Sequence, residues 1–230
     1  GVCQVSTTLY NAVLKAELEV TQRSNHSMIV TYVKPSMDAA IAGDYKDLKF
    51  VNNLDAPIYI EGYTVGKDIY FNIYGQETRP SNRKVTYESE VVSEEDPGTQ
   101  FVATGDAVGS ISTTQGKHMG YVARLWKIVT VDGVEQSRDA INKSTYKSSP
   151  KIVNVGTASA DPNATAAVNA ALATGDEATI YATVAQYSGA GQTPSEAPAE
   201  APADSSAEAA AILGTVDESQ ITGNTTTEGQ

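Results

Sequence analysis

The chain has 230 residues, of which 40% are hydrophobic, and a formal net charge of −12 at pH 7. All 16 Lys and Arg residues and 18 of the 28 Asp and Glu residues lie before residue 158, so this part carries −2 and the remainder carries −10. The absence of clustered Lys and Arg argues against nucleic acid as a partner, because phosphate contacts need such clusters. The single cysteine excludes an internal disulfide, and no stretch reaches the length of a transmembrane helix.

The first part of the chain is predicted to be α+β: one helix followed by a small antiparallel sheet. Apolar residues at three-to-four spacing predict a helix over residues 6–20, with Ser6, Thr7 or Thr8 capping its start. Runs of apolar and β-branched residues predict the strands that follow. These strands are expected at 28–33, 39–42, 48–51, 58–63 and 68–74, and the last two form a hairpin through Val65-Gly66-Lys67.

The second part is predicted to be an elongated all-β domain over residues 85–157, after a polar linker at 77–84. Val131-Asp132-Gly133-Val134 is typical of a type I′ hairpin. Residues 158–230 are dominated by Ala, Thr, Ser, Gly, Pro and acids, which predicts a disordered tail. Marginal helices fit 163–186, but the composition of this stretch favours no buried core.

Two residues carry the chemistry of the first block. Cys3 lies where a polar turn enters a helix, and His26 directly precedes an apolar, strand-like run. Because the first N–H groups of a helix lack partners and the helix dipole is positive there, negative charge on sulfur is favoured. A cysteine and a histidine in these positions are the minimal set for thiol nucleophilic catalysis.

Several strings of the first block match a known pattern. They are Gly1-Val2-Cys3-Gln4-Val5-Ser6-Thr7-Thr8-Leu9-Tyr10, Asn25-His26-Ser27, Asp38-Ala39, Asp47-Leu48-Lys49-Phe50-Val51-Asn52-Asn53 and Pro57-Ile58-Tyr59-Ile60. Residues 1–76 thereby resemble the VanW-like domain, a family named after an accessory protein of vancomycin-resistance clusters. Only one glycine precedes the cysteine, where the family motif has more. We therefore expect an N-terminally truncated chain that holds the C-terminal part of that domain.

Residues 85–157 are similar to the five-glycine domain that often follows VanW-like domains in wall-associated proteins of Gram-positive bacteria. The matching residues are Gly116, Gly120-Tyr121-Val122, Gly133, Arg138, Ile141, Tyr146, Pro150-Lys151-Ile152-Val153 and Val155-Gly156. This resemblance implies an elongated module that binds cell-wall amino sugars. It also implies an extracellular location, in the wall or on the membrane-anchored surface, with membrane attachment only through a segment that this sequence lacks.

Some VanW-like proteins are associated with L,D-transpeptidase activity, so the resemblance implies acyl transfer on peptidoglycan stem peptides through a cysteine thiolate. Cys3 would be the nucleophile, and His26 would take and return its proton. Asp38 is the first candidate to orient the imidazole, and Asp47 the second. The oxyanion would be stabilised by Gln4, through its side chain or the first backbone N–H groups.

Candidates for substrate contact are Ser6 and Thr7, beside the thiol, and Tyr59. Tyr59 and Tyr63 share one face of their strand, while Tyr70 and Tyr74 share another on the next strand, an arrangement that suits glycan, peptide or simple cross-strand packing. The proposed reaction needs no cofactor.

Each assignment has an alternative. Cys3 is also compatible with a small buried hydrophobe, His26 with a structural residue at a strand edge, and Asp38 with a turn residue. The three together could hold Zn²⁺, although the close repeat spacing of metal motifs is missing. For the whole chain, the alternative function is a non-catalytic module that binds peptidoglycan or amino sugars.

Overall fold

The computed structural model describes residues 1–188, so the predicted tail beyond residue 188 lies outside the described residues. The first block comprises helix α1 and two separate two-stranded antiparallel sheets, β1–β2 and β3–β4. The elements are α1 (Val2–Lys15), β1 (Glu19–Gln22), β2 (Lys49–Val51), β3 (Tyr59–Val65) and β4 (Asp68–Tyr74). The hairpin predicted between β3 and β4 is confirmed, with Gly66 at a φ of 61°.

Helix α1 begins four residues earlier than predicted, so Cys3 lies inside its first turn. Gly1 is the N-cap residue, and the Gln4 side chain accepts a hydrogen bond from the Gly1 ammonium at 3.0 Å. Ser6 and Thr7 are therefore internal helix positions and not caps. The helix ends at Lys15 because Glu17 adopts a φ of 55°, a left-handed conformation that reverses the chain into β1.

The strands predicted at 28–33 and 39–42 are not present. Residues 23–47 form an irregular loop whose only backbone ladder is an isolated bridge between Ala42 and Lys46. Met37 and Ala39 are buried in a core shared with α1 and the second block and Val33 packs against it, whereas Met28 is exposed, so tertiary contacts override β propensity here. The strand partner of β2 is instead β1, whose Val20 also fits the apolar stripe of the helix pattern.

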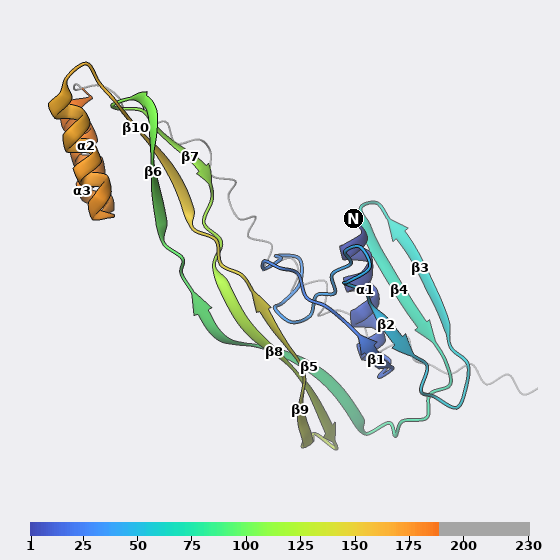
Figure 1. Ribbon diagram of the computed structural model, residues 1–230. Helices are drawn as coiled ribbons and strands as arrows, with labels where there is room; N and C mark the ends of the chain where they lie inside the picture. Colours follow the sequence, from blue (N-terminus) through green and yellow to red (C-terminus); the bar gives the residue numbers. More distant parts are fainter. Residues whose placement is uncertain (189–230) are drawn as a thin grey trace, which may run out of the picture.

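The second block is two long three-stranded sheets, in the orders β5-β8-β9 and β6-β10-β7. Its strands are β5 (Arg83–Glu95), β6 (Thr99–Ala107), β7 (Ile111–Gln115), β8 (Gly120–Val131), β9 (Val134–Tyr146) and β10 (Lys151–Ala158). The β8–β9 turn is the predicted hairpin, with positive φ at Asp132 and Gly133. Figure 1 shows the two sheets following one another as an elongated module, as expected.

The prediction that residues after 157 bury no core is wrong for the described part of that segment. Helices α2 (Pro162–Thr174) and α3 (Glu177–Tyr187) form a hairpin against β6 and β10 at the far end of the module (Figure 1). Asp161 and Asp176 cap them, and Gly175 ends α2 in the left-handed region. Their small apolar side chains reach a core because β10 offers a complementary apolar face. The buried members of this core are Val153, Val155, Val168, Ala171, Ile180 and Val184.

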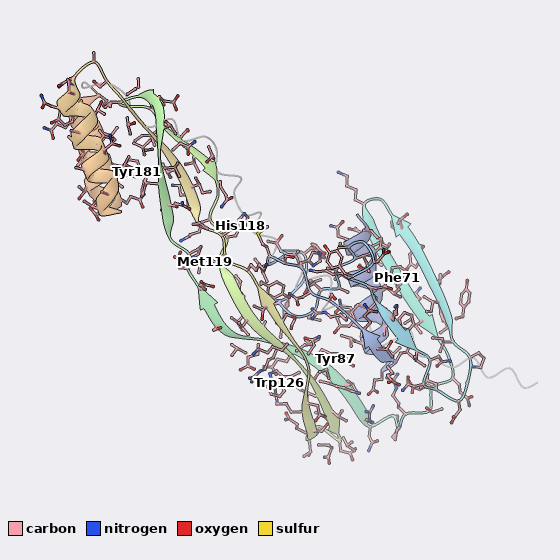
Figure 2. The ribbon with its side chains drawn as sticks, in the orientation of Figure 1. Phe71, Tyr87, His118, Met119, Trp126 and Tyr181 are labelled. Carbon is pink, nitrogen blue, oxygen red and sulfur yellow. The ribbon has the colours of Figure 1, made fainter. Side chains whose placement is uncertain are left out.

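Figure 2 shows Tyr181 on α3 near the strands, where its ring meets the ring of Phe101 edge-on at 5.9 Å. The same figure shows Tyr87 of β5 at the junction of the two blocks. There, the core of the first block continues into the second. Its buried members are Tyr10, Leu14, Met37, Ala39 and Leu125, of which the last belongs to β8. The first block therefore completes its core with a strand of the second.

Candidate active site

Asp38 is the centre of a buried polar cluster at the junction of the two blocks. Its side chain is only 1% exposed, and both carboxylate oxygens accept two hydrogen bonds each. Oδ1 accepts from Arg23 Nη2 at 2.8 Å and from the Tyr146 hydroxyl at 2.5 Å. Oδ2 accepts from the backbone N–H of His26 at 2.7 Å and lies 2.6 Å from His26 Nδ1. The structure thus brings together His26 and Asp38, the first-choice orienting residue.

The electrostatics of this cluster favour an ionised carboxylate. Burial raises the pKa of Asp38, but the hydrogen bonds from Tyr146 and His26 and the charge of Arg23 outweigh burial and hold that pKa below its usual value. A carboxylate that stays charged fixes the imidazole orientation by accepting the Nδ1 proton, which leaves Nε2 as the free basic nitrogen.

The Nε2 atom of His26 faces Tyr32, whose hydroxyl lies 3.4 Å away. Tyr32 also neighbours the helix start: burial raises the pKa of Tyr32, a hydrogen bond with Thr7 lowers it, and the negative charges of Cys3 and Asp38 raise it further. Tyr32 therefore has both the imidazole of His26 and the thiol of Cys3 among its electrostatic neighbours. No motif points to Tyr32, whose one feature in the sequence is its place in an apolar run.

Cys3 is half-buried in the first turn of α1, and its thiol donates to the carbonyl oxygen of Ile41 at 3.6 Å. Within residues 1–188, no hydrogen bond joins the thiol to His26. Both residues interact with Tyr32: His26 through the 3.4 Å approach of its Nε2 to the hydroxyl, and Cys3 electrostatically.

Ser6 and Thr7 do not fit the predicted role of substrate contact, because both are buried and occupied. Ser6 Oγ donates to the Ala39 carbonyl at 2.5 Å, and Thr7 Oγ1 accepts from the Ala39 N–H at 3.0 Å. These bonds fasten the chain next to Asp38 onto α1. The two hydroxyls therefore position the aspartate segment.

The other predicted residues lie on the surface. Gln4 is exposed; its side-chain oxygen accepts from the Gly1 ammonium, and its backbone N–H donates to the Gly1 carbonyl at 3.0 Å. Asp47, the second candidate to orient the imidazole, is 47% exposed and lies 3.8 Å from Lys49, and in the described part of the chain it makes no hydrogen bond to His26. Tyr59 is 65% exposed on β3.

Tyr59, Tyr63, Tyr70 and Tyr74 lie on one face of the β3–β4 hairpin, and not on two separate faces as expected. The antiparallel register sets Tyr59 opposite Tyr74 and Tyr63 opposite Tyr70. The rings of each pair stack, with centroids 6.1 Å and 5.2 Å apart. Residues at alternate positions, including Phe71, point to the other face of the hairpin, beside α1 (Figure 2). We call the four exposed residues Tyr59, Tyr63, Tyr70 and Tyr74 the tyrosine face.

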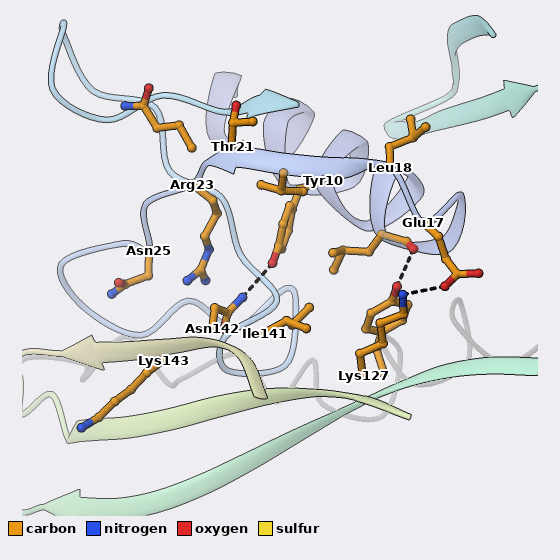
Figure 3. A pocket seen from close by; sticks show the side chains of 14 residues that line it. Tyr10, Glu17, Leu18, Thr21, Arg23, Asn25, Lys127, Ile141, Asn142 and Lys143 are labelled. Carbon is orange, nitrogen blue, oxygen red and sulfur yellow. Dashed lines mark hydrogen bonds and ion pairs between the residues drawn. The ribbon is translucent and has the colours of Figure 1, made fainter. Parts of the chain in front are cut away.

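A cavity of about 390 Å³ lies between the blocks, beside the Asp38 cluster. Its walls come from α1, β1, β8 and β9, and Figure 3 shows Tyr10 and Asn142 facing each other across it, joined by a 2.7 Å hydrogen bond. At one end Lys127 pairs with Glu17. Cys3 and His26 do not line this cavity.

Residues 1–188 contain no group of three or more His, Cys, Asp or Glu side chains arranged to hold a metal ion. Among the helices of the described region, none is long and apolar enough to cross a membrane.

Comparison with known proteins gives the domain composition. Residues 1–74 match the family described as VanW like protein, and residues 82–158 match the G5 domain, the five-glycine domain of the sequence analysis. The chain therefore carries a VanW-like domain on its N-terminal side, followed by a G5 domain.

A curated relative and two solved structures share parts of this arrangement. The "Uncharacterized protein YoaR" of Bacillus subtilis (strain 168) is 38% identical over 77 residues, which cover 34% of this chain and 25% of the relative. The chain thus matches a quarter of that relative's length. The "IgA1 Protease G5 domain structure" is 26% identical with a TM-score of 0.25, covering 34% of this chain and 94% of that one. The structure of HP0197-G5 is 20% identical with a TM-score of 0.18, covering 32% and 99%.

Proposed function

We propose that this protein is a cell-wall-associated cysteine acyltransferase that acts on peptidoglycan stem peptides in the manner of an L,D-transpeptidase. The observation that carries the proposal is the Asp38–His26 pair at 2.6 Å, whose imidazole Nε2 lies 3.4 Å from the hydroxyl of Tyr32, a residue that also interacts electrostatically with Cys3. A buried carboxylate, an imidazole and a thiol on a helix N-terminal turn are the parts that nucleophilic acyl transfer needs.

In this reaction the Cys3 thiolate attacks an amide carbonyl of the donor peptide, after its proton passes to His26 Nε2. The C–N bond then breaks, and His26 returns the proton to the leaving amine, so that a thioester remains on Cys3. The amine of a second peptide attacks the thioester, loses its proton to His26, and releases the thiol. Asp38 stays ionised throughout and stabilises the imidazolium that forms twice in each cycle.

Tyr32 decides how the proton travels. Since its hydroxyl occupies the hydrogen-bonding position at Nε2, it either moves aside when substrate binds or carries the proton between sulfur and imidazole. Tyr32→Phe separates the two routes. The variant keeps its activity if the ring only has to move, and loses most of it if the hydroxyl relays the proton.

The test is the alkylation rate of Cys3 against pH in the full chain, followed by a stem-peptide exchange assay. We expect a rate that is already high near neutral pH, that falls about tenfold or more in His26→Ala, and that is unchanged in His118→Ala, which removes the other histidine. The proposed enzymatic function would be refuted by an alkylation rate that is slow, rises only near the pKa of a free thiol, about 8.5, and is the same in His26→Ala as in the wild type.

The proposed location of the protein follows from its proposed substrate and binding partner. Stem peptides and wall glycan lie outside the cell, so we place this protein in the wall or on the outer surface of a Gram-positive bacterium, where the G5 domain holds it near glycan.

A non-catalytic wall-binding module is the second candidate, and the tyrosine face favours it. Its four rings are between 38% and 65% exposed. Between the two stacked pairs, Glu61 accepts hydrogen bonds from Asn72 and the Tyr74 hydroxyl. Aromatic rings beside polar groups suit a sugar, which has an apolar face and hydroxyl edges.

Cosedimentation with purified peptidoglycan tests this candidate. Tyr63→Ala combined with Tyr70→Ala should release the protein from the wall material, while the same change at exposed Tyr45 should not. Equal binding by both variants would contradict a role for the tyrosine face.

A further inference from the structure

The end of strand β9 holds the loop that carries the candidate catalytic residues. Two hydrogen bonds form connections to the backbone: the Lys147 backbone N–H donates to Ser27 O at 2.7 Å, and the side-chain amide of Asn25 donates through Nδ2 to Thr145 O at 2.9 Å. Both connections join the G5 domain to residues that flank His26. The loop has no strand ladder beyond one isolated bridge, so these contacts restrain it together with the hydrogen bonds from α1 to Ala39.

Side chains of β9 reach further, to Asp38 itself. The Tyr146 hydroxyl donates to Asp38 Oδ1 at 2.5 Å and accepts from the Ser36 backbone N–H at 2.8 Å, and the residue is 2% exposed. Ser144 accepts from Arg23 Nη1 at 2.8 Å, while the Nη2 group of the same guanidinium binds Asp38. The carboxylate therefore has a direct and an indirect partner on β9.

We propose that Tyr146, a residue of the G5 domain, is a positioning residue for the Asp38–His26 pair, so that the thiol site of the VanW-like domain is completed by the domain that follows it. The inference rests on the proposed acyl transfer, because positioning has a function only if His26 acts on Cys3. It makes the G5 domain part of the active site and not only an anchor.

The hydroxyl acts by keeping Asp38 ionised and correctly turned. Several titratable or charged groups interact with the Asp38 carboxylate. They are Arg23, His26 and Tyr32 of the same loop, Tyr10 of α1 and Tyr146 of β9. Of these, Arg23 and the backbone of His26 are fixed donors, and they remain when the Tyr146 hydroxyl is removed. Its loss raises the pKa of Asp38 toward the usual range, and a protonated Asp38 no longer accepts the Nδ1 proton of His26.

The experiment uses Tyr146→Phe in the full chain, which keeps the ring in its buried place. Tyr121→Phe is the matched control, because Tyr121 lies opposite Tyr146 in the β8–β9 register and is not among the residues that donate hydrogen bonds to Asp38. Two readouts are followed: the pH profile of Cys3 alkylation, and the NMR resonance of the His26 Nδ1 proton, which reports its bond to Asp38 directly.

In Tyr146→Phe we expect the limb of the profile in which the rate falls because Asp38 is protonated to move to higher pH by about one unit, since a hydrogen bond to a charged group changes the pKa of that group by about this amount. The Nδ1 resonance should move as well, and Tyr121→Phe should change neither. Ser144→Ala removes only the hydroxyl that binds the Arg23 guanidinium, so it should shift the profile in the same direction by a smaller amount. This variant replaces Tyr146→Phe in the test if Tyr146→Phe does not fold. An unchanged limb and resonance in the folded β9 variants would overturn the inference.

Failure of the proposed function has a different signature. If the alkylation rate of the wild type does not depend on His26, the acyl transfer fails, and the Nδ1 resonance still decides whether Tyr146 positions the Asp38–His26 pair.

Discussion

Replacing Asp38 with asparagine is the sharpest perturbation of the buried cluster, because the two side chains have the same shape and differ in charge and donors. The carboxylate is the acceptor in all four of its hydrogen bonds, two at each oxygen. An asparagine has one acceptor oxygen and one NH₂ donor. In either orientation its NH₂ group therefore faces two donor positions, and at least one backbone or guanidinium donor loses its acceptor.

The magnitude follows from burial. Arg23 and Asp38 have side-chain exposures of 7% and 1%, so the substitution leaves a buried guanidinium without its counter-charge. Breaking a buried pair in this way costs about 3–5 kcal/mol. For a chain of this size, each kcal/mol lowers the melting temperature by about 2–4 °C, so we expect a decrease of about 10 °C.

Thermal and urea unfolding at neutral pH measure the effect, with Asp47→Asn as the control at the exposed alternative, expected within about 0.5 kcal/mol of wild type. The pKa of Asp38 is lowered by folding, so its contribution to stability is present above pH 4 and is lost as the pH falls through the folded-state value. The difference in the free energy of unfolding between Asp38→Asn and the wild type should therefore become smaller below pH 4. A destabilisation no larger than that of Asp47→Asn would refute the reasoning.

Three further predictions concern stability. Glu17 pairs with Arg79 of the linker, Arg83 of β5 and Lys127 of β8, and its pKa is lowered to about 2, mainly by Arg83. The contribution of Glu17 to stability is therefore lost as the pH falls from about 4 toward 2. Glu17→Gln should lower stability at pH 7 but not at pH 2, and Glu19→Gln should change neither; equal loss at both pH values would contradict this. Ile180→Ala should cost about 2–5 kcal/mol in denaturant unfolding, because the side chain is fully buried, and a neutral result would mean that α3 does not share the core. Gly156→Ala places a methyl group in steric overlap with the backbone carbonyl of Ala107 in β6 and should cost about 1–3 kcal/mol or more, whereas Gly116→Ala, whose methyl group meets nothing within 4 Å, should be nearly neutral. Similar melting temperatures of the two variants would disprove the close approach at Gly156.

Local sequence patterns predicted the structure correctly where neighbouring residues determine the backbone conformation. The hairpins at Gly66 and at Asp132-Gly133 follow from residues that tolerate positive φ, and the β-rich second block follows from alternating apolar runs. The order of the two domains was visible because their motifs are short and contiguous. The choice of Cys3, His26 and Asp38 as candidates came from the same motifs.

Local patterns failed where a partner distant in the chain decides the structure. The apolar run at 28–33 lacks a neighbouring strand and folds instead as the loop that carries Tyr32. The small apolar residues of α2 and α3 have too little surface to form a core alone, but β10 gives them one.

The sequence by itself determined which residue types could perform thiol chemistry and in which segments they lie, since nucleophile, base and acid are properties of single side chains. Only the tertiary structure decided their partners. It chose Asp38 over Asp47, placed Tyr32 before the imidazole and brought Tyr146 from 108 positions away to the carboxylate. The reason is that hydrogen bonds act over about 3 Å in space, and the packing of the G5 domain against the VanW-like domain sets those distances.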